Sequence, residues 1–243
     1  MLPHLTEPYT SALRAALEYI HTRYAPTGIL VSGTIIRGNP HPASDLDFVV
    51  VHPHHWRQRT QRWFGDAPGE MFVNPPFELE RAMHRDAASG RPIMPHMLAT
   101  GVILHDPTNS VNGLQQLAEE LLDKGLSCSS ESLSLQRYAI ATWFEDAVDI
   151  ALIAPDLASA FITEALLSSV RLMFLDDGQW IPRQKLLLSE FERRYPDWGT
   201  LVRTSLRCAS VAEQLDLAAP FIEHVASVTG FFEWESEPQT VAP

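Results

Sequence analysis

Cysteine is scarce in this sequence, and its two thiols offer no framework for a disulfide-stabilised fold. Cys128 and Cys208 stand far apart in the chain, without the close spacing that metal-binding cysteines show. We therefore expect two buried or unreactive thiols.

Long apolar runs are also lacking. No stretch of about 18 apolar residues is present that would span a bilayer. The first residues, MLPHLTEPYT, do not place a basic segment before an apolar one, as a secretory signal does. We therefore expect a cytoplasmic protein without a membrane partner, whose oligomeric state the sequence leaves open.

Positive charge is the third shortage. The chain has 18 Lys and Arg against 30 Asp and Glu, a formal net charge of −12 over 243 residues. Nucleic-acid binding draws on clustered Lys and Arg, so a nucleic-acid partner is disfavoured. An acidic surface attracts cationic small molecules at long range, although acidity is also a common route to solubility.

The first part of the chain mixes helical and strand patterns. Apolar residues three and four positions apart over 9–24 predict an amphipathic helix that stops before Pro26 and Gly28. Short apolar runs predict strands at 28–32, 46–52, 69–74 and 101–107, and the segments between them predict helices at 54–65 and 77–89.

After Pro107 the strand signals almost disappear. Helical periodicity covers 113–124, 131–153, 157–175, 183–195 and 198–229, and the polar, Pro-containing end of the chain predicts a flexible tail. We predict an α+β protein of two domains. A mixed sheet flanked by helices would occupy 1–109, an all-α helical bundle 110–235, and the tail 236–243.

Two carboxylates interrupt an apolar strand in the stretch VSGTIIRGNPHPASDLDFVVVH, residues 31–52. Side chains alternate along a strand, so Asp45 and Asp47 project to one side about 7 Å apart. Like charges this close raise each other's pKa and repel, which a purely structural strand has no reason to tolerate. Divalent cations such as Mg²⁺ take oxygen ligands and remove that cost.

A Gly-Thr turn precedes the two acids. Glycine after a buried strand lets backbone N–H groups approach an anion, and a hydroxyl adds a donor, so Gly33 and Thr34 are candidates to seat a phosphate. Each signal is common by itself. Their order is more restrictive: a strand, Gly-Thr, a spacer over 35–44, and then Asp-Leu-Asp inside an apolar strand.

This order resembles the signature of the polymerase-beta-type nucleotidyltransferase superfamily, through Ser32-Gly33-Thr34 and Asp45-Leu46-Asp47-Phe48. Thr34 stands where that family usually has Ser, and it keeps the hydroxyl. The resemblance implies that Asp45 and Asp47 hold Mg²⁺ and that Gly33 and Thr34 contact the triphosphate of a nucleotide.

The superfamily also uses a third carboxylate from a neighbouring strand, for which Glu70 and Glu78 are candidates. We prefer Glu70, because it lies in the apolar strand GEMFVN, whereas Glu78 follows two prolines in a predicted helix. An exposed acid at a strand start is the alternative for Glu70.

The two-domain layout is similar to that of aminoglycoside nucleotidyltransferases, such as those modifying kanamycin or streptomycin, which add a C-terminal helical domain. In the predicted helix 131–153, Glu145 and Asp149 share a face, and Glu145 is our candidate general base. A solvated acidic surface is the alternative. A later segment resembles the part of the helical domain that supplies a Lys to the nucleotide phosphates, which makes Lys185 the candidate, with an ordinary surface Lys as the alternative.

These residues predict an enzyme that moves a nucleoside monophosphate, AMP from ATP by preference, onto a hydroxyl of a small acceptor and releases pyrophosphate. A cationic aminoglycoside-like acceptor is one expectation. Alternatives are an adenylyltransferase of antitoxin type that modifies a protein hydroxyl, and a nucleotide-binding regulator without turnover. The adjacent His52, His54 and His55 are expected to be surface residues, because no further metal ligands stand at a matching spacing.

Overall fold

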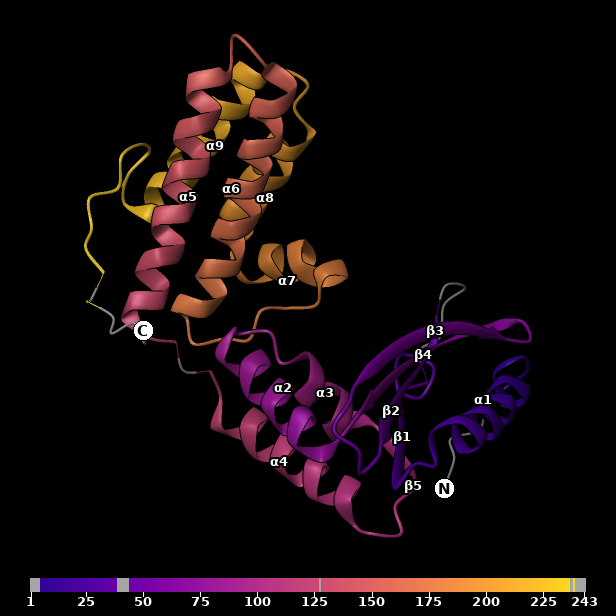
Figure 1. The fold of residues 1–243 in the computed structure, drawn as a ribbon. Helices are drawn as coiled ribbons and strands as arrows, with labels where there is room; N and C mark the ends of the chain where they lie inside the picture. The colour runs from indigo at the N-terminus through magenta and orange to yellow at the C-terminus, as the bar shows by residue number, and fades with distance from the viewer. Residues whose placement is uncertain (1–4, 39–43, 127, 237, 239–243) are drawn as a thin grey trace. The chain divides into compact units, whose positions relative to one another are not determined.

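The computed structural model describes residues 5–38, 44–126, 128–236 and 238. The chain divides into two compact units, Met1–Gly125 and Leu126–Pro243, which are described separately below. The predicted α+β organisation is confirmed: a mixed sheet with flanking helices comes first and an all-helical part follows (Figure 1). Most of the predicted tail, 236–243, lies outside the described residues.

The N-terminal unit is built on a five-stranded sheet with the order β3-β4-β2-β1-β5. Strands β2 and β4 run parallel, and the other neighbours pair antiparallel. In chain order the elements are α1 (Tyr9–Tyr24), β1 (Gly28–Ser32), β2 (Leu46–Val51), β3 (Gln58–Phe64), β4 (Ala67–Asn74), α2 (Pro76–Ala88), α3 (Ile93–Thr100), β5 (Val102–His105) and α4 (Ser110–Lys124).

Helices cover both faces of the sheet, which explains why β1 and β2 read as continuous apolar runs. Ile29, Val31 and Phe48 point into one core with the apolar stripe of α1. Leu30 and Val49 point into a second core with α2, α3 and α4. Because neighbouring residues alternate between the faces, Asp47 belongs to the same face as Val49.

The prediction of a helix at 54–65 was wrong, because this segment contains strand β3. It forms a hairpin with β4 in which Phe64 pairs with Ala67 across the turn Gly65–Asp66. Gly65 adopts φ 63°, the left-handed conformation that a tight hairpin turn needs at this position. Strand β3 lies at the sheet edge and is largely exposed, so its sequence lacks the apolar alternation that marks a half-buried strand.

The division between the units falls later than the predicted domain boundary at residue 109. Helix α4 packs on α2 and α3 and contributes Val111, Leu114 and Ala118 to the core over the second face of the sheet. Helix α3 was missed because it has only eight residues and contains a proline. The N-terminal unit therefore extends through α4 to Gly125.

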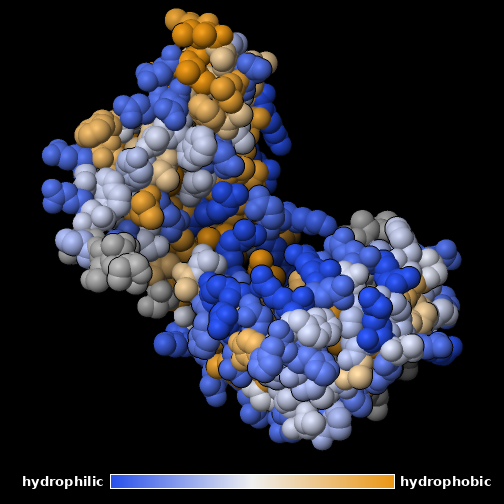
Figure 2. Space-filling model, viewed as in Figure 1, coloured by the Kyte–Doolittle hydropathy of each residue, from blue (hydrophilic) through white to orange (hydrophobic). Residues whose placement is uncertain are grey.

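The C-terminal unit is a helical bundle, as predicted. Its elements are α5 (Ser130–Ile150), α6 (Pro155–Asp176), the 3₁₀ turn η1 (Gln184–Leu186), α7 (Leu187–Arg194), α8 (Pro196–Arg207) and α9 (Val211–Ala226). The single helix predicted at 198–229 is in fact two helices. Helix α8 ends before Cys208, and α9 begins after Ser210, whose hydroxyl caps the new helix by accepting a hydrogen bond from the N–H of Glu213. The turn between α5 and α6 exposes apolar surface at one end of the bundle (Figure 2).

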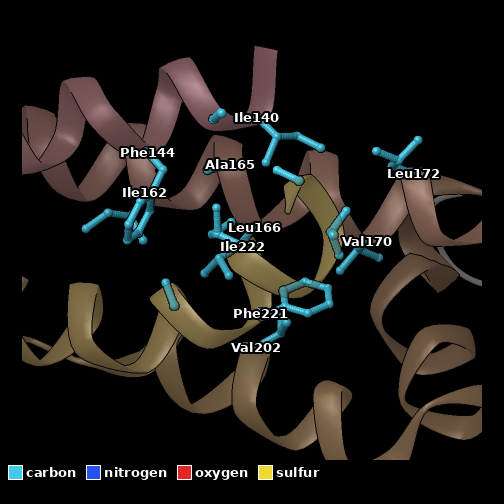
Figure 3. Packing of buried hydrophobic residues seen from close by; sticks show 14 of the residues in the cluster. Ile140, Phe144, Ile162, Ala165, Leu166, Val170, Leu172, Val202, Phe221 and Ile222 are labelled. Carbon is cyan, nitrogen blue, oxygen red and sulfur yellow. The ribbon is translucent and has the colours of Figure 1, made fainter. Parts of the chain in front are cut away.

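Helix α6 lies at the centre of this unit. Its Ile162 lies beside Phe144 of α5 (Figure 3). Leu166 and Val170 of α6 lie near Ile222 and Phe221 of α9 in the same core. By length and composition α6 is apolar enough to cross a membrane, and 44% of its most apolar window is buried inside the protein. Helix α6 packs against α5 and α9, so its apolar composition is that of a core helix.

The expectation of surface histidines was wrong for His52, which is completely buried, and right for His54 and His55, which are exposed. The ring of His52 stacks on Trp56 at 4.0 Å between centroids, and its Nδ1 accepts a hydrogen bond from the N–H of His54. Burial lowers the pKa of His52 because the charged imidazolium loses its hydration.

The packing of α4 predicts the effect of Leu114→Ala. Leu114 is 3% exposed, so its truncation should lower the free energy of unfolding by about 2–5 kcal/mol. Hydrogen exchange should show the lost protection within residues 1–125, whereas Gln116→Ala on the exposed face of α4 should change little. Loss of protection confined to 126–243 would contradict the placement of α4.

The lowered pKa of His52 predicts a pH dependence of stability. Below about pH 6.5 the His52 imidazole of the unfolded chain takes up a proton more readily than that of the folded chain. The free energy of unfolding therefore decreases as the pH falls from about 6.5 toward the lower pKa that His52 has in the folded protein. His52→Asn keeps an acceptor for the His54 N–H and removes the titration. Urea unfolding from pH 7 to 5 should therefore show a shallower loss in the variant, and parallel curves would contradict this role.

Candidate active site

Three carboxylates meet at the start of the parallel strand pair β2–β4. The register places Asp47 opposite Glu70, and Asp45 precedes β2 by one residue on the same side of the chain as Asp47. One oxygen from each of the three side chains lies within 4.8 Å of the others. Asp45 and Asp47 are half-buried and Glu70 is buried. The structure thus brings together the three acids that the sequence analysis selected as metal ligands.

Two side chains of β3 hold Glu70 in place. Arg59 Nε forms a salt bridge with Glu70 Oε1, and Gln61 Nε2 donates a hydrogen bond to the same oxygen at 3.1 Å. The hydrogen bond to Glu70 raises the pKa of Arg59. The sequence analysis missed both residues because it assigned β3 as a helix. The signal that identifies them is their spacing of two, which puts both on the side of the hairpin that faces Glu70.

The alternative third carboxylate, Glu78, has a different environment. It lies in the first turn of α2 and accepts hydrogen bonds from Arg57, Arg81 and Arg85 at 3.2, 3.3 and 3.4 Å. Glu78 is not part of the cluster of Asp45, Asp47 and Glu70 that the described residues form. Its charge is compensated by arginines, so Glu78 is explained as a structural ion-pair centre.

Gly33 follows β1 and approaches the two aspartates closely. Its φ of 107° disfavours any side chain, and a Cβ here would lie 3.0 Å from Asp47 Oδ2 and 3.2 Å from the carbonyl oxygen of Asp45. The neighbouring Ser32 pairs with Asp47 in the sheet register, and its buried Oγ has no hydrogen-bond partner among the described residues. Thr34 Oγ1 lies 2.9 Å from Ser44 Oγ.

This donor set fits a hard divalent cation. Carboxylate oxygens are the ligands that Mg²⁺ prefers, and a hydrated ion could also satisfy the unpaired Ser32 hydroxyl. Glycine at position 33 lets the backbone lie directly against the two aspartates, where any side chain would collide with Asp47.

An open pocket of about 240 Å³ adjoins the carboxylates within the same unit. Asp45 and Glu70 form one side of it, and β3 contributes Gln61, Arg62 and Trp63. The Trp63 side chain is 69% exposed, and the guanidinium of Arg62 lies over the ring of Tyr19 at 4.4 Å. The pocket offers an aromatic surface next to the carboxylate cluster, which suits stacking of a ring or an amine.

The remaining predicted residues belong to the C-terminal unit. Glu145 is half-buried on α5, and Lys185 is exposed in η1. Their roles as general base and phosphate ligand stay predictions.

Neither protein-family models nor curated proteins match the chain. Among solved structures, its fold is similar to the crystal structure of a nucleotidyltransferase-like protein from Exiguobacterium sibiricum 255-15. The match covers 90% of this chain and 74% of that chain, with a TM-score of 0.56 and 14% sequence identity. The chain therefore has a nucleotidyltransferase-like fold.

The carboxylate cluster predicts opposite effects of Asp47→Asn with and without metal. Two unit charges about 5 Å apart repel by about 3 kcal/mol at an effective dielectric constant of about 20, and solvent reduces this for half-buried groups. Without divalent ions, the variant should have a Tm a few degrees above that of the original protein. Added Mg²⁺ should raise the Tm of the original protein only. A Tm rise with Mg²⁺ that is equal in both would contradict the site.

Proposed function

We propose that the protein is a Mg²⁺-dependent nucleotidyltransferase that moves AMP from ATP onto a hydroxyl of a small acceptor and releases pyrophosphate. The observation that carries the proposal is the meeting of three carboxylate oxygens within 4.8 Å beside a glycine turn. The nucleotidyltransferase-like fold supports the same reaction class. We further propose that the protein acts in the cytoplasm and has no nucleic-acid partner, in keeping with its net charge of −12.

The reaction is a displacement at phosphorus. The acceptor oxygen forms a bond to the α-phosphorus of ATP, and the bond from that phosphorus to the oxygen bridging to the β-phosphate breaks, with pyrophosphate as the leaving group. The proton of the acceptor hydroxyl passes to a base, for which we propose Glu145.

In this proposal Asp45, Asp47 and Glu70 would hold Mg²⁺, which when bound activates the attacking oxygen and neutralises charge on the leaving group. Arg59 and Gln61 orient Glu70 through the contacts described above. Gly33 and Thr34 receive the triphosphate through backbone N–H groups and a hydroxyl. Lys185 would neutralise phosphate charge.

For the acceptor we propose a small hydroxyl compound, with a cationic aminoglycoside-like molecule as the leading candidate. The pocket supports this choice because the exposed Trp63 in its lining offers an aromatic face on which a protonated amine can bind. A protein hydroxyl, as in adenylyltransferases of antitoxin type, is the alternative acceptor.

Pyrophosphate release tests the reaction directly. The protein is incubated with Mg²⁺, each of the four nucleoside triphosphates in turn, and a panel of hydroxyl acceptors that includes aminoglycosides. We expect acceptor-dependent pyrophosphate with ATP preferred, and mass spectrometry should find the acceptor heavier by one AMP. Nucleotide binding without pyrophosphate from any acceptor would support a regulator without turnover instead.

Glu70→Gln and Glu78→Gln form a matched pair that assigns the third carboxylate. We expect Glu70→Gln to lower kcat by about 100-fold or more while ATP binding is retained, because one oxygen ligand at the reacting centre is weakened. Glu78→Gln should stay within about twofold, since that side chain pairs with arginines outside the cluster. Equal loss in both variants would contradict the assignment.

A further inference from the structure

Four large aliphatic side chains are exposed in the turn between α5 and α6 and at the helix ends beside it. Leu152 is 99% exposed, Ile153 85%, Val148 50% and Leu157 47%. We call these four residues the hairpin tip. They account for the apolar surface at the end of the bundle where α5 turns into α6 (Figure 2).

Such a group is unusual in a connecting turn. Single exposed apolar residues are common on protein surfaces, whereas turns between helices are ordinarily polar. Ala151, Leu152, Ile153 and Ala154 follow one another here without a polar residue. Contiguous exposed apolar groups with polar surroundings mark interaction sites.

The chain segment that forms the hairpin tip and its flanking helix ends carries charge of one sign. Residues 138–170 contain five acids and no Lys, Arg or His; the acids are Glu145, Asp146, Asp149, Asp156 and Glu164. Asp146, Asp149 and Asp156, the three nearest to the turn in sequence, are all exposed. A partner must therefore bring apolar groups surrounded by positive charge.

This requirement selects among possible occupants. A second copy that met the first through the same surface would place acidic side chains against acidic side chains. The anionic surface of a cytoplasmic membrane would repel the same acids. A basic amphipathic segment satisfies both needs, since its apolar face covers the aliphatic side chains while Lys and Arg reach the carboxylates.

We propose that the hairpin tip is the docking site for a basic amphipathic segment of a partner protein. Leu152 and Ile153 supply the apolar contact, and Asp149 and Asp156 pair with the partner's Lys and Arg. The site lies wholly within the C-terminal unit, and the proposal does not depend on the nucleotidyltransferase reaction.

The test uses a fluorescent synthetic peptide of Leu and Lys in helical amphipathic order, titrated with the full chain and followed by anisotropy. Two further peptides are compared, one with Glu in place of Lys and one with the same Leu and Lys in scrambled order. We expect the amphipathic Leu–Lys peptide to bind about tenfold more tightly than either. Equal binding of the scrambled peptide would show only attraction to an acidic protein and would overturn the proposal.

Variants assign the binding to the hairpin tip. Leu152→Ser/Ile153→Ser and Asp149→Asn/Asp156→Asn should each weaken binding by about tenfold. Glu119→Gln/Glu120→Gln, which makes the same charge change on exposed positions of α4, should stay within about twofold. Circular dichroism and Tm verify that the folds are retained, which the exposure of Leu152 and Ile153 favours.

Two other outcomes would overturn the proposal in favour of a different occupant. One is a dimer in sedimentation velocity that Leu152→Ser/Ile153→Ser converts to monomer. The other is sedimentation with phosphatidylserine-containing vesicles that the same variant abolishes. Peptide affinity unchanged in both tip variants would also reject it.

Discussion

Mutual repulsion among three carboxylates is the constraint on which the candidate site depends. Asp45, Asp47 and Glu70 reach within 4.8 Å of one another because β2 and β4 run parallel with Asp47 opposite Glu70. The salt bridge from Arg59 and the hydrogen bond from Gln61 compensate one of these charges. Three carboxylates this close remain a concentration of negative charge, and a divalent cation is the chemical species that best stabilises such a cluster.

The sheet supplies the rigidity that this arrangement needs. Helices cover both faces, so β1 and β2 are buried along their length and their register is fixed by two separate cores. A shift of one residue in β2 would turn Asp47 toward the core under α1 and Phe48 toward the other face. The apolar residues that alternate with the acids therefore help to position the site as well as to stabilise the unit.

Much of this could be predicted from the sequence, because the relevant signals are local. The spacing of two between Asp45 and Asp47 inside an apolar run gives both the strand and the shared face, and Gly33 marks the close approach.

Arg59 and Gln61 could not be found in the same way. They lie on an exposed edge strand whose polar residues resemble a helix surface, and only pairing with β4 shows its conformation. His52 was misjudged because it continues the buried strand β2, pairs through its N–H with the Asn74 carbonyl and stacks on Trp56, contacts that a run of histidines does not reveal. The end of the N-terminal unit was placed too early because α4 packs on α2 and α3, contacts that periodicity does not reveal.

Anomalous diffraction from crystals grown with MnCl₂ and a non-hydrolysable ATP analogue tests the central claim most directly. Manganese replaces magnesium at oxygen sites and is located by its own scattering. We predict a manganese peak bound by carboxylate oxygens of Asp45, Asp47 and Glu70, with the triphosphate next to Gly33. A nucleotide bound elsewhere, or three carboxylates without manganese between them, would contradict the account.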